Sequence, residues 1–582
     1  MIALQLGLRA WALFPSWFYS DDYRLMTQAR DQGFGRAYLG EPFDGHLLPL
    51  GRAIAFLVQS SGRADWTTAA SVTWTLQALA SVLCLVMLVV LFGVRWGILV
   101  PLGLYLFLAV TVPASMWWAA SLSQQPFQVV FFATVASWVT YLRGRSPWWL
   151  CATFVAVALG LSTYEKALLL LPVMAFVMLA YFAAGTPLAR ARACLSSYWP
   201  SLVLAALVAV GYLVVYAALV ESPVRLPGPG VAGRLADTML GTALPSGLTG
   251  GPWRWSADNP PVARADPPDW TVHASWVLIV LVVLWLFARR SRTLRAWALL
   301  AGYAASAYLL LFSSRVAAFG AGLGLEYRYL TDVVLVLSLC VGLATMPLRG
   351  AVESSAPRTD PLVRSHLRTP WPAVVVALVC ASGIVSTVRY VAVWHDDNPG
   401  DAWAHSVMDG LRGQGEVDLA DTSVPEAVMP AFAAPYNRAS AIVPLLVDNA
   451  RFPEASNRLT VLDGDGVPRA ASVQAVAQSS RGPDDGCGWR IDGGASVRVP
   501  LDTTTFDYDW WMRIGYLASG DGPLTVVAGD DDVDARVVAG LGTLFVHVTG
   551  EVGAVTFTGL APGTTLCVDQ VQVGSLEPGG YL

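Results

Sequence analysis

Hydrophobic positions in this chain gather in long runs as far as residue 391, and these runs are separated by short polar segments. An α-helix needs about 20 mostly apolar residues to cross the hydrocarbon core of a bilayer. Ten runs fit this length and predict membrane-spanning helices. They are 71–93, 97–116, 127–142, 148–164, 167–184, 200–220, 274–288, 296–313, 329–347 and 371–391.

An eleventh apolar run, residues 2–14, is too short to cross a bilayer. It also lacks the basic start and the small-residue cleavage site of a signal peptide. We therefore expect it to be a truncated first helix, which brings the predicted total to about 11 spans.

The pattern changes after residue 391. Residues 392–480 combine a helical stretch with strand-like segments, and this predicts a mixed α/β segment. From Trp489 onward, short alternating runs are separated by Gly, Asp and Pro, and they predict a β-sandwich over 481–582. The predicted fold is therefore a polytopic α-helical membrane domain, residues 1–391 with a first outer loop at 15–70, followed by a mainly-β C-terminal domain.

Composition and charge agree with this division. The chain is 55% hydrophobic and only 14% charged, which is typical of a polytopic membrane protein. Up to Val391 there are 16 acidic and 27 basic residues, whereas the rest has 26 acidic and 10 basic residues, a net charge of −16. The first part is thus expected in the bilayer and the last third in water.

Arginines set the predicted orientation, because basic residues favour cytoplasmic loops. They fall on alternate loops, which places 15–70, 117–126, 162–166, 221–273, 314–328 and everything after 391 on the outer side. We therefore predict a multi-pass plasma-membrane protein with an extracytoplasmic C-terminal domain. The basic positions are Arg95, Arg143, Arg145, Arg190, Arg192, Arg289, Arg290, Arg292, Arg295, Arg349, Arg358, Arg364 and Arg368.

Seven cysteines are present, and only Cys487 and Cys567 lie in the part predicted to be exported. Two cysteines in an oxidising compartment predict one disulfide.

The first outer loop contains two adjacent carboxylates, Asp21 and Asp22, directly after the first helix and among aromatic residues. A carboxylate at a low-dielectric boundary can act as a general base toward a hydroxyl. Alternatively, both residues cap the helix that follows and favour its N-terminal dipole.

These residues resemble the GT-C superfamily of membrane glycosyltransferases, which includes protein O-mannosyltransferases and actinobacterial arabinofuranosyltransferases. The resemblance lies in the short first helix, Asp21-Asp22, the segment Gly45-His46-x-x-Pro49, the many spans and the outer C-terminal domain. It implies a polyprenyl-phosphate sugar donor, an extracytoplasmic active site and a first-loop aspartate as base.

On this resemblance Asp21 is the favoured base, and Asp22 orients the acceptor or a cation, although the sequence does not decide between them. His46 is expected over the same cavity as a hydrogen-bonding partner, or else it is structural. Arg52, in the same loop, is a further candidate. A divalent metal at Asp21 and Asp22 is an open alternative, and no other cofactor is predicted.

A lipid phosphate leaving group needs positive charge. Lys166 is the only lysine of the chain and follows Glu165 in an outer turn, while Arg315 and Arg328 bound another outer loop. We hypothesise that these three cations contact the donor phosphate and that Glu165 holds a loop or an acceptor hydroxyl. The alternatives are that Lys166 anchors the membrane interface and that Arg328 pairs with Glu326.

The predicted function is transfer of a sugar from a polyprenyl-phosphate donor to an extracytoplasmic glycan, lipid or protein. The alternatives are a transporter or flippase for lipid-linked glycans, which calls for charged residues within the spans, and a non-catalytic envelope scaffold. No Walker, HExxH or Gly-x-Ser-x-Gly motif is present, and nothing indicates nucleic acid. The β-domain can bind carbohydrate through aromatic residues, for which the candidates are Tyr508, Trp510, Trp511 and Tyr516.

Overall fold

The computed structural model describes residues 1–221, 224, 226–228, 230–359 and 371–579. It divides into two compact units, 1–398 and 399–582. Two of the basic positions used for the orientation, Arg364 and Arg368, lie outside the described residues.

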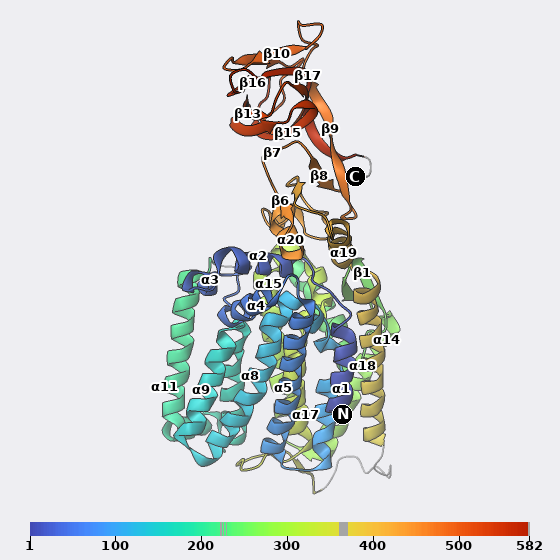
Figure 1. Cartoon of the computed structure of the whole chain (residues 1–582). Helices are drawn as coiled ribbons and strands as arrows, with labels where there is room; N and C mark the ends of the chain where they lie inside the picture. Colours follow the sequence, from blue (N-terminus) through green and yellow to red (C-terminus); the bar gives the residue numbers. More distant parts are fainter. Residues whose placement is uncertain (222–223, 225, 229, 360–370, 580–582) are drawn as a thin grey trace. The chain divides into compact units, whose positions relative to one another are not determined.

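The first unit is a bundle of helices that run side by side (Figure 1). Every apolar run predicted from the sequence is largely helical, including the short first one. Within the described ranges, five helices are long and apolar enough to cross a membrane, or six if one bent pair counts as a span. The total of about 11 spans therefore stays a prediction. The helices are α1 (Ile2–Leu13), α5 (Trp66–Phe92), α6 (Leu99–Phe107), α8 (Trp118–Gly144), α9 (Pro147–Leu161), α10 (Leu170–Tyr181), α11 (Pro187–Leu219), α14 (Asp269–Arg289), α15 (Leu294–Ser314), α17 (Thr331–Thr345) and α18 (Trp371–Asp396).

The run 97–116 differs from the unbroken span that the sequence predicts. It is interrupted after α6, and the two halves are bent by 47°. The second half consists of the short helices η2 (Ala109–Thr111) and α7 (Pro113–Met116). Pro113 has no N–H to continue a helical ladder, which favours a break here. The broken end lies next to α1, because the buried Arg9 donates hydrogen bonds to the hydroxyls of Thr111 and Ser115.

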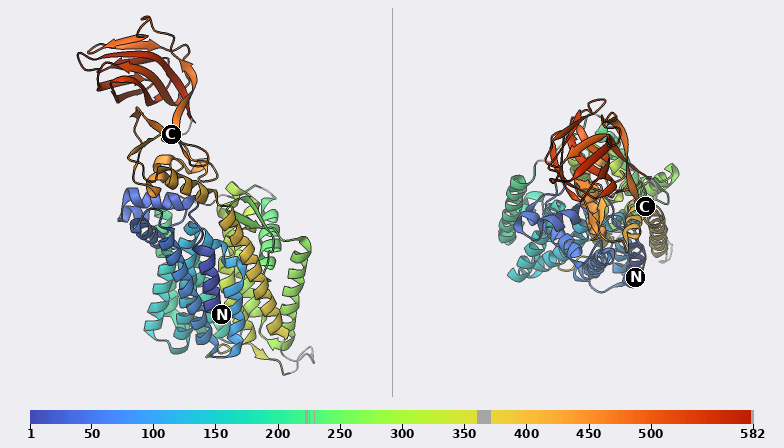
Figure 2. Two further views of the ribbon diagram at one scale, coloured as in Figure 1. Left: turned by 45° about the vertical axis from the view of Figure 1, so that its right-hand side comes forward. Right: turned by 45° about the horizontal axis from the view of Figure 1, so that its top comes forward.

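One end of the bundle carries the short helices of the first loop, which lie across it (Figure 2). A β-hairpin and two 3-10 turns lie at the same end. These elements are α2 (Asp21–Gln32), α3 (Arg36–Gly40), α4 (Pro49–Ser61), η3 (Glu165–Leu169), η6 (Tyr327–Tyr329), β1 (Trp255–Asn259) and β2 (Val262–Ala265). All of them lie in, or begin in, loops that the sequence predicts on one side of the membrane.

The opposite end gathers the arginine-rich loops. Glu353 accepts from Arg190 at 2.6 Å and from Arg295 at 2.5 Å. Arg143 donates to the main-chain carbonyls of Arg349 at 2.7 Å and Val90 at 2.8 Å. The alternation of loops predicted from charge is thus present in the fold, and which end faces the cytoplasm stays a prediction.

The second unit contains two sheets that enclose one apolar core. The larger sheet begins with the parallel strands β6, β5 and β8 and continues through the antiparallel strands β9, β17, β12 and β15. The larger sheet contains strands from both sides of residue 480. The segments expected as 392–480 and 481–582 therefore fold as one unit. Its elements are α19 (Pro399–Leu411), α20 (Ala439–Leu446), β5 (Val417–Leu419), β6 (Ala450–Arg451), β7 (Ala455–Ser456), β8 (Leu459–Leu462), β9 (Pro468–Gln478), β10 (Trp489–Asp492), β11 (Val497–Pro500), β12 (Tyr508–Ala518), β13 (Gly522–Ala528), β14 (Asp531–Val537), β15 (Gly540–Gly550), β16 (Ala554–Thr558) and β17 (Thr565–Pro578).

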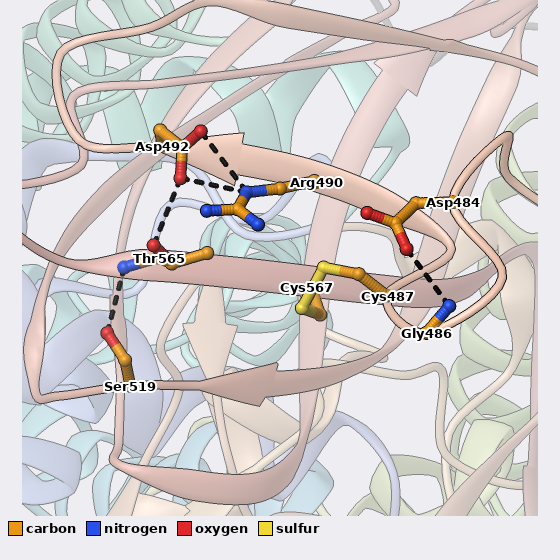
Figure 3. Close-up of a disulfide and its surroundings, with 8 residues drawn as sticks. All are labelled: Asp484, Gly486, Cys487, Arg490, Asp492, Ser519, Thr565 and Cys567. Carbon is orange, nitrogen blue, oxygen red and sulfur yellow. Dashed lines mark hydrogen bonds and ion pairs between the residues drawn. A yellow bond between two sulfur atoms is a disulfide. The ribbon is translucent and has the colours of Figure 1, made fainter.

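The disulfide predicted from the sequence is confirmed. Cys487 precedes β10 and is bonded to Cys567 on β17, with 4.8 Å between their Cα atoms (Figure 3). Strand β10 pairs with β17 in the same region, where Arg490 lies opposite Cys567.

Three of the four aromatic residues considered for sugar stacking belong to the interior of this unit. Trp510, Trp511 and Tyr516 are buried, whereas Tyr508 is exposed. The exposed Phe506 lies beside Tyr508, with 5.5 Å between the ring centroids. Carbohydrate binding here stays a prediction, and the rings open to solvent for it are Tyr508 and Phe506.

Candidate active site

The two first-loop carboxylates occupy different environments at the start of α2. Asp22 is fully buried, and its carboxylate accepts hydrogen bonds from the main-chain N–H groups of Tyr19 at 2.9 Å and Ala119 at 2.7 Å. It therefore fastens the first loop to the start of α8. Asp21 is partly exposed, and none of the described residues donates a hydrogen bond to its carboxylate or forms an ion pair with it.

The electrostatic surroundings of Asp21 suit a base. Burial raises the pKa of Asp21 to about 6, and Asp44 adds to this effect. The cations Arg24, Arg328 and Arg315 oppose it. The carboxylate is thus ionised near neutral pH, yet it is more basic than an exposed aspartate. Burial also raises the pKa of Asp22, whose two backbone hydrogen bonds act in the other direction.

The donor set at Asp21 and Asp22 does not fit a divalent metal. Both oxygens of Asp22 are engaged by main-chain N–H groups, which leaves Asp21 as a lone ligand. Hard cations need several oxygen ligands. Over the described part of the chain, no group of three or more His, Cys, Asp or Glu side chains is arranged to hold a metal ion.

His46 joins two other outer loops. Its Nε2 lies 2.6 Å from a guanidinium nitrogen of Arg315, and its Nδ1 lies 2.9 Å from the Glu165 carboxylate. Because arginine can only donate, Nε2 accepts and Nδ1–H donates to Glu165. Burial alone would raise the pKa of Glu165, but the contact with His46 lowers it. Glu165, His46 and Arg315 thus form one hydrogen-bonded chain. The charge of Arg315, at the end of this chain, also acts on Asp21.

Arg328 lies on the short turn η6 and faces an aromatic wall. Its guanidinium is 4.2 Å from the ring centroid of Trp117 and 4.9 Å from that of Tyr329. It also forms an ion pair with Glu326 at 2.7 Å, which is the alternative that the sequence leaves open. Glu326 is shared, since Arg264 of β2 lies 3.6 Å from its other oxygen.

Lys166 is buried and already has an anionic partner. Its Nζ lies 3.1 Å from Asp332 and donates to the Tyr329 carbonyl at 3.3 Å. Asp332 also accepts from the Tyr303 hydroxyl at 3.1 Å. The charge of Lys166 is therefore compensated within the bundle, and its contact with Tyr329 supports the turn that carries Arg328.

Arg52 lies among the helices of the first loop. Its side chain is fully buried and donates to the Glu41 carbonyl at 2.8 Å and to the Gln28 side chain at 3.1 Å. The guanidinium also covers the ring of Tyr38, 5.0 Å from the centroid. These contacts join α2, α3 and α4, so Arg52 holds the loop in shape.

The structure thus brings Asp21 of the first outer loop within the electrostatic influence of Arg315 and Arg328, which bound another outer loop. His46 contacts Arg315 and connects it to Glu165. Sequence reasoning missed several residues that complete this end. Asp332 is an acid within an apolar run, a signal that could have paired it with Lys166. Trp117, Asn259 and Arg264 carry no comparable signal, because only the fold places their loops next to the aspartates.

No protein-family model matches the chain, and no curated protein matches its sequence. Among solved structures, the chain matches the arabinofuranosyltransferase AftD from Mycobacteria at 13% identity and a TM-score of 0.39, over 100% of this chain and 58% of that one. A mutant of the same protein matches at 13% identity and a TM-score of 0.33, over 100% and 61%. ArnT from Cupriavidus metallidurans, solved with undecaprenyl phosphate bound, matches at 10% identity and a TM-score of 0.31, over 74% and 83%.

The chain spans less than two thirds of the length of AftD. Similarity at this level does not establish a shared activity, and the assignment of function rests on the site itself.

Proposed function

We propose that this protein is a membrane glycosyltransferase that moves a sugar from a polyprenyl-phosphate donor to an acceptor on the outer side of the membrane. The observation that carries the proposal is the carboxylate of Asp21, which has no partner among the described residues and lies in the field of Arg328 and Arg315. An uncompensated base beside cations, at the end of an apolar bundle, fits a lipid phosphate and a hydroxyl nucleophile.

The proposed reaction uses these groups in one displacement. Asp21 takes the proton of an acceptor hydroxyl, whose oxygen attacks the anomeric carbon of the donor sugar. A bond forms between that oxygen and the anomeric carbon, and the bond from this carbon to the phosphate oxygen breaks. The electron pair leaves with the polyprenyl phosphate, and its charge is stabilised by the guanidinium groups of Arg328 and Arg315.

The neighbouring residues support this division of labour. Asp22 fixes the loop that carries Asp21, through its two backbone hydrogen bonds. His46 and Glu165 hold Arg315 from behind. Lys166 was predicted to contact the phosphate directly, but its ion pair with Asp332 favours an indirect role. We propose that it holds the turn η6 so that Arg328 faces the donor.

Orientation is part of the same proposal. The end of the bundle with Asp21 is placed outside, because the arginine-rich loops gather at the opposite end and basic loops favour the cytoplasm. The acidic second unit would then be outside as well, where its disulfide is stable.

A transfer assay tests the proposal. The purified full chain, reconstituted in vesicles, is incubated with radiolabelled polyprenyl-phosphate pentoses and hexoses and with an extract of envelope glycans as acceptors. The proposal expects label to pass from lipid to acceptor for at least one donor. Label that only crosses the bilayer while still attached to lipid would instead identify a flippase.

A further inference from the structure

The β1–β2 hairpin reaches the site from the long loop between α11 and α14. Asn259, at its tip, donates through Nδ2 to the hydroxyl of Tyr19 at 3.3 Å. Trp255, at its base, packs against Tyr327 and Tyr390, with ring centroids 5.1 and 4.7 Å away. Aromatic contacts thus fix the base of the hairpin. Its polar tip contacts Tyr19, which is two positions before Asp21.

Tyr19 connects the hairpin to the proposed base. Burial raises the pKa of Tyr19 to about 12, and the charge of Asp21 raises it as well, whereas Arg328 opposes this effect. Its ring also packs edge-on against Trp117, 5.4 Å away, which is the ring that Arg328 covers. Tyr19 is therefore within the electrostatic influence of both the base and the cation.

The contact between Tyr19 and Asn259 leaves one donor and one acceptor without a partner among the described residues. The Tyr19 hydroxyl accepts from Asn259, but no described residue accepts its proton. The amide oxygen of Asn259, an exposed residue, likewise receives no hydrogen bond from the part of the chain that the structure describes. Together with the Asp21 carboxylate, the site offers one donor and two acceptors that no described residue uses.

The same hairpin also contacts the cationic side of the site. Arg264 of β2 shares Glu326 with Arg328, and 39% of its side chain is exposed. Asn259 and Arg264 of the hairpin are thus open to solvent, whereas Tyr19 is buried and Asp21 is partly exposed.

We propose that Asn259 and Tyr19 are specificity-determining residues that bind the acceptor, and that the acceptor is a polyhydroxylated compound with neighbouring hydroxyl groups. Each sugar hydroxyl both donates and accepts, so two neighbouring hydroxyls match the unused proton of Tyr19 and the unused oxygen of Asn259. A third hydroxyl then faces Asp21 as the nucleophile. This inference rests on the proposed function, because it takes Asp21 as the base.

The test compares binding of two ligands by the purified full chain and its Asn259→Ala and Tyr19→Phe variants. One ligand is a set of fluorescently labelled soluble oligosaccharides built of pentofuranose or hexopyranose units, and the other is undecaprenyl phosphate. The matched control is Asp258→Ala, since Asp258 is exposed on the same hairpin and its carboxylate accepts from the nearby Ser256 at 2.7 Å.

We expect each of the two variants to bind the preferred oligosaccharide at least tenfold more weakly than the wild type, with unchanged affinity for undecaprenyl phosphate. Asp258→Ala should bind both ligands as the wild type does. Three results would overturn the inference: equal oligosaccharide affinity in Asn259→Ala, no binding of any oligosaccharide by the wild type, or weakened undecaprenyl phosphate binding, which would assign the hairpin to the donor. Failure of the wild type to bind undecaprenyl phosphate would count against the proposed function instead.

Discussion

The two ends of the helical bundle both concentrate charge, but they use it differently. At the arginine-rich end, Arg190 and Arg295 both pair with Glu353, and Arg143 donates to main-chain carbonyls. At the other end Asp21 has no hydrogen-bond or ion-pair partner among the described residues, although Arg328 and Arg315 act on it. Charged side chains that form ion pairs hold loops together. A charged side chain that lies near others but forms no ion pair is available to a substrate.

Lys166 shows that both uses occur at the same end. Its ion pair with Asp332 is buried and complete, like the pairs at the opposite end. Paired and unpaired charges therefore occur at the same end of the bundle.

The largest effect is expected from Lys166→Met, which leaves Asp332 buried without a counter-charge. Breaking a buried pair in this way costs about 3–5 kcal/mol of unfolding free energy. The double variant Lys166→Met/Asp332→Leu should recover most of this loss, because it removes both charges. Thermal and denaturant unfolding in detergent measure it.

Undecaprenyl phosphate binding by the Lys166→Met/Asp332→Leu variant separates the two roles considered for Lys166. A stable double variant that binds the lipid with near wild-type affinity would support the indirect role. A stable double variant that has lost the lipid would mean that Lys166 contacts the phosphate directly.

A smaller effect is expected from Arg328→Met on the affinity for undecaprenyl phosphate. A hydrogen bond to a charged group contributes about 1.5–3 kcal/mol, which corresponds to about 10- to 100-fold in the dissociation constant. Arg349→Met, at the arginine-rich end, is the matched control and should bind the lipid normally. Equal affinities in the two variants would remove Arg328 from the phosphate site.

The pH dependence of transfer should reflect Asp21. Its pKa is raised to about 6, and a base must be ionised, so the rate should rise with pH up to this value and then level off. Below it the rate should fall about tenfold for each pH unit. A rate measured between pH 4.5 and 8 checks this, and a profile without a step in that range would speak against Asp21 as the base.

The smallest effect is expected from Glu353→Gln at the arginine-rich end. Loss of this carboxylate leaves Arg190 and Arg295 close together and less well bound, and it should lower the unfolding free energy by about 1–3 kcal/mol. Transfer and lipid affinity should stay at wild-type levels once the protein is folded. A specific loss of transfer would show that matched charges at this end also serve the reaction.

Much of the fold follows from local patterns in the sequence. The apolar runs predict the helices, and the arginines divide the loops into two groups. Cys487 and Cys567 are the two cysteines of the acidic C-terminal part, and this predicts their disulfide. Each of these signals depends on neighbouring residues or on simple counting.

The missed features depend on contacts between distant segments. The break in the run 97–116 is stabilised by Arg9 of another helix, and Asp332 receives Lys166 from a loop 166 positions away from it.

 The hairpin that meets Tyr19 lies some 240 residues further along the chain. Periodicity cannot report such contacts, because it describes only which face of an element is apolar.

The two adjacent aspartates illustrate the same limit within the site. Because the two residues are adjacent, they share the same stretch of sequence, which leaves open which of them is the base. The fold distinguishes them, because the main-chain N–H of Ala119 donates to Asp22, whereas Asp21 has no partner in the part of the chain that the structure describes.

The most direct test of the central claim is the rate of sugar transfer by Asp21→Asn compared with Asp22→Asn, each corrected for the amount of folded protein and for its affinity for undecaprenyl phosphate. If Asp21 is the general base, Asp21→Asn should lose about 10²- to 10⁴-fold in rate with unchanged lipid affinity, whereas folded Asp22→Asn should keep most of its rate. Equal rates in the two variants, or a wild-type rate in Asp21→Asn, would contradict the account.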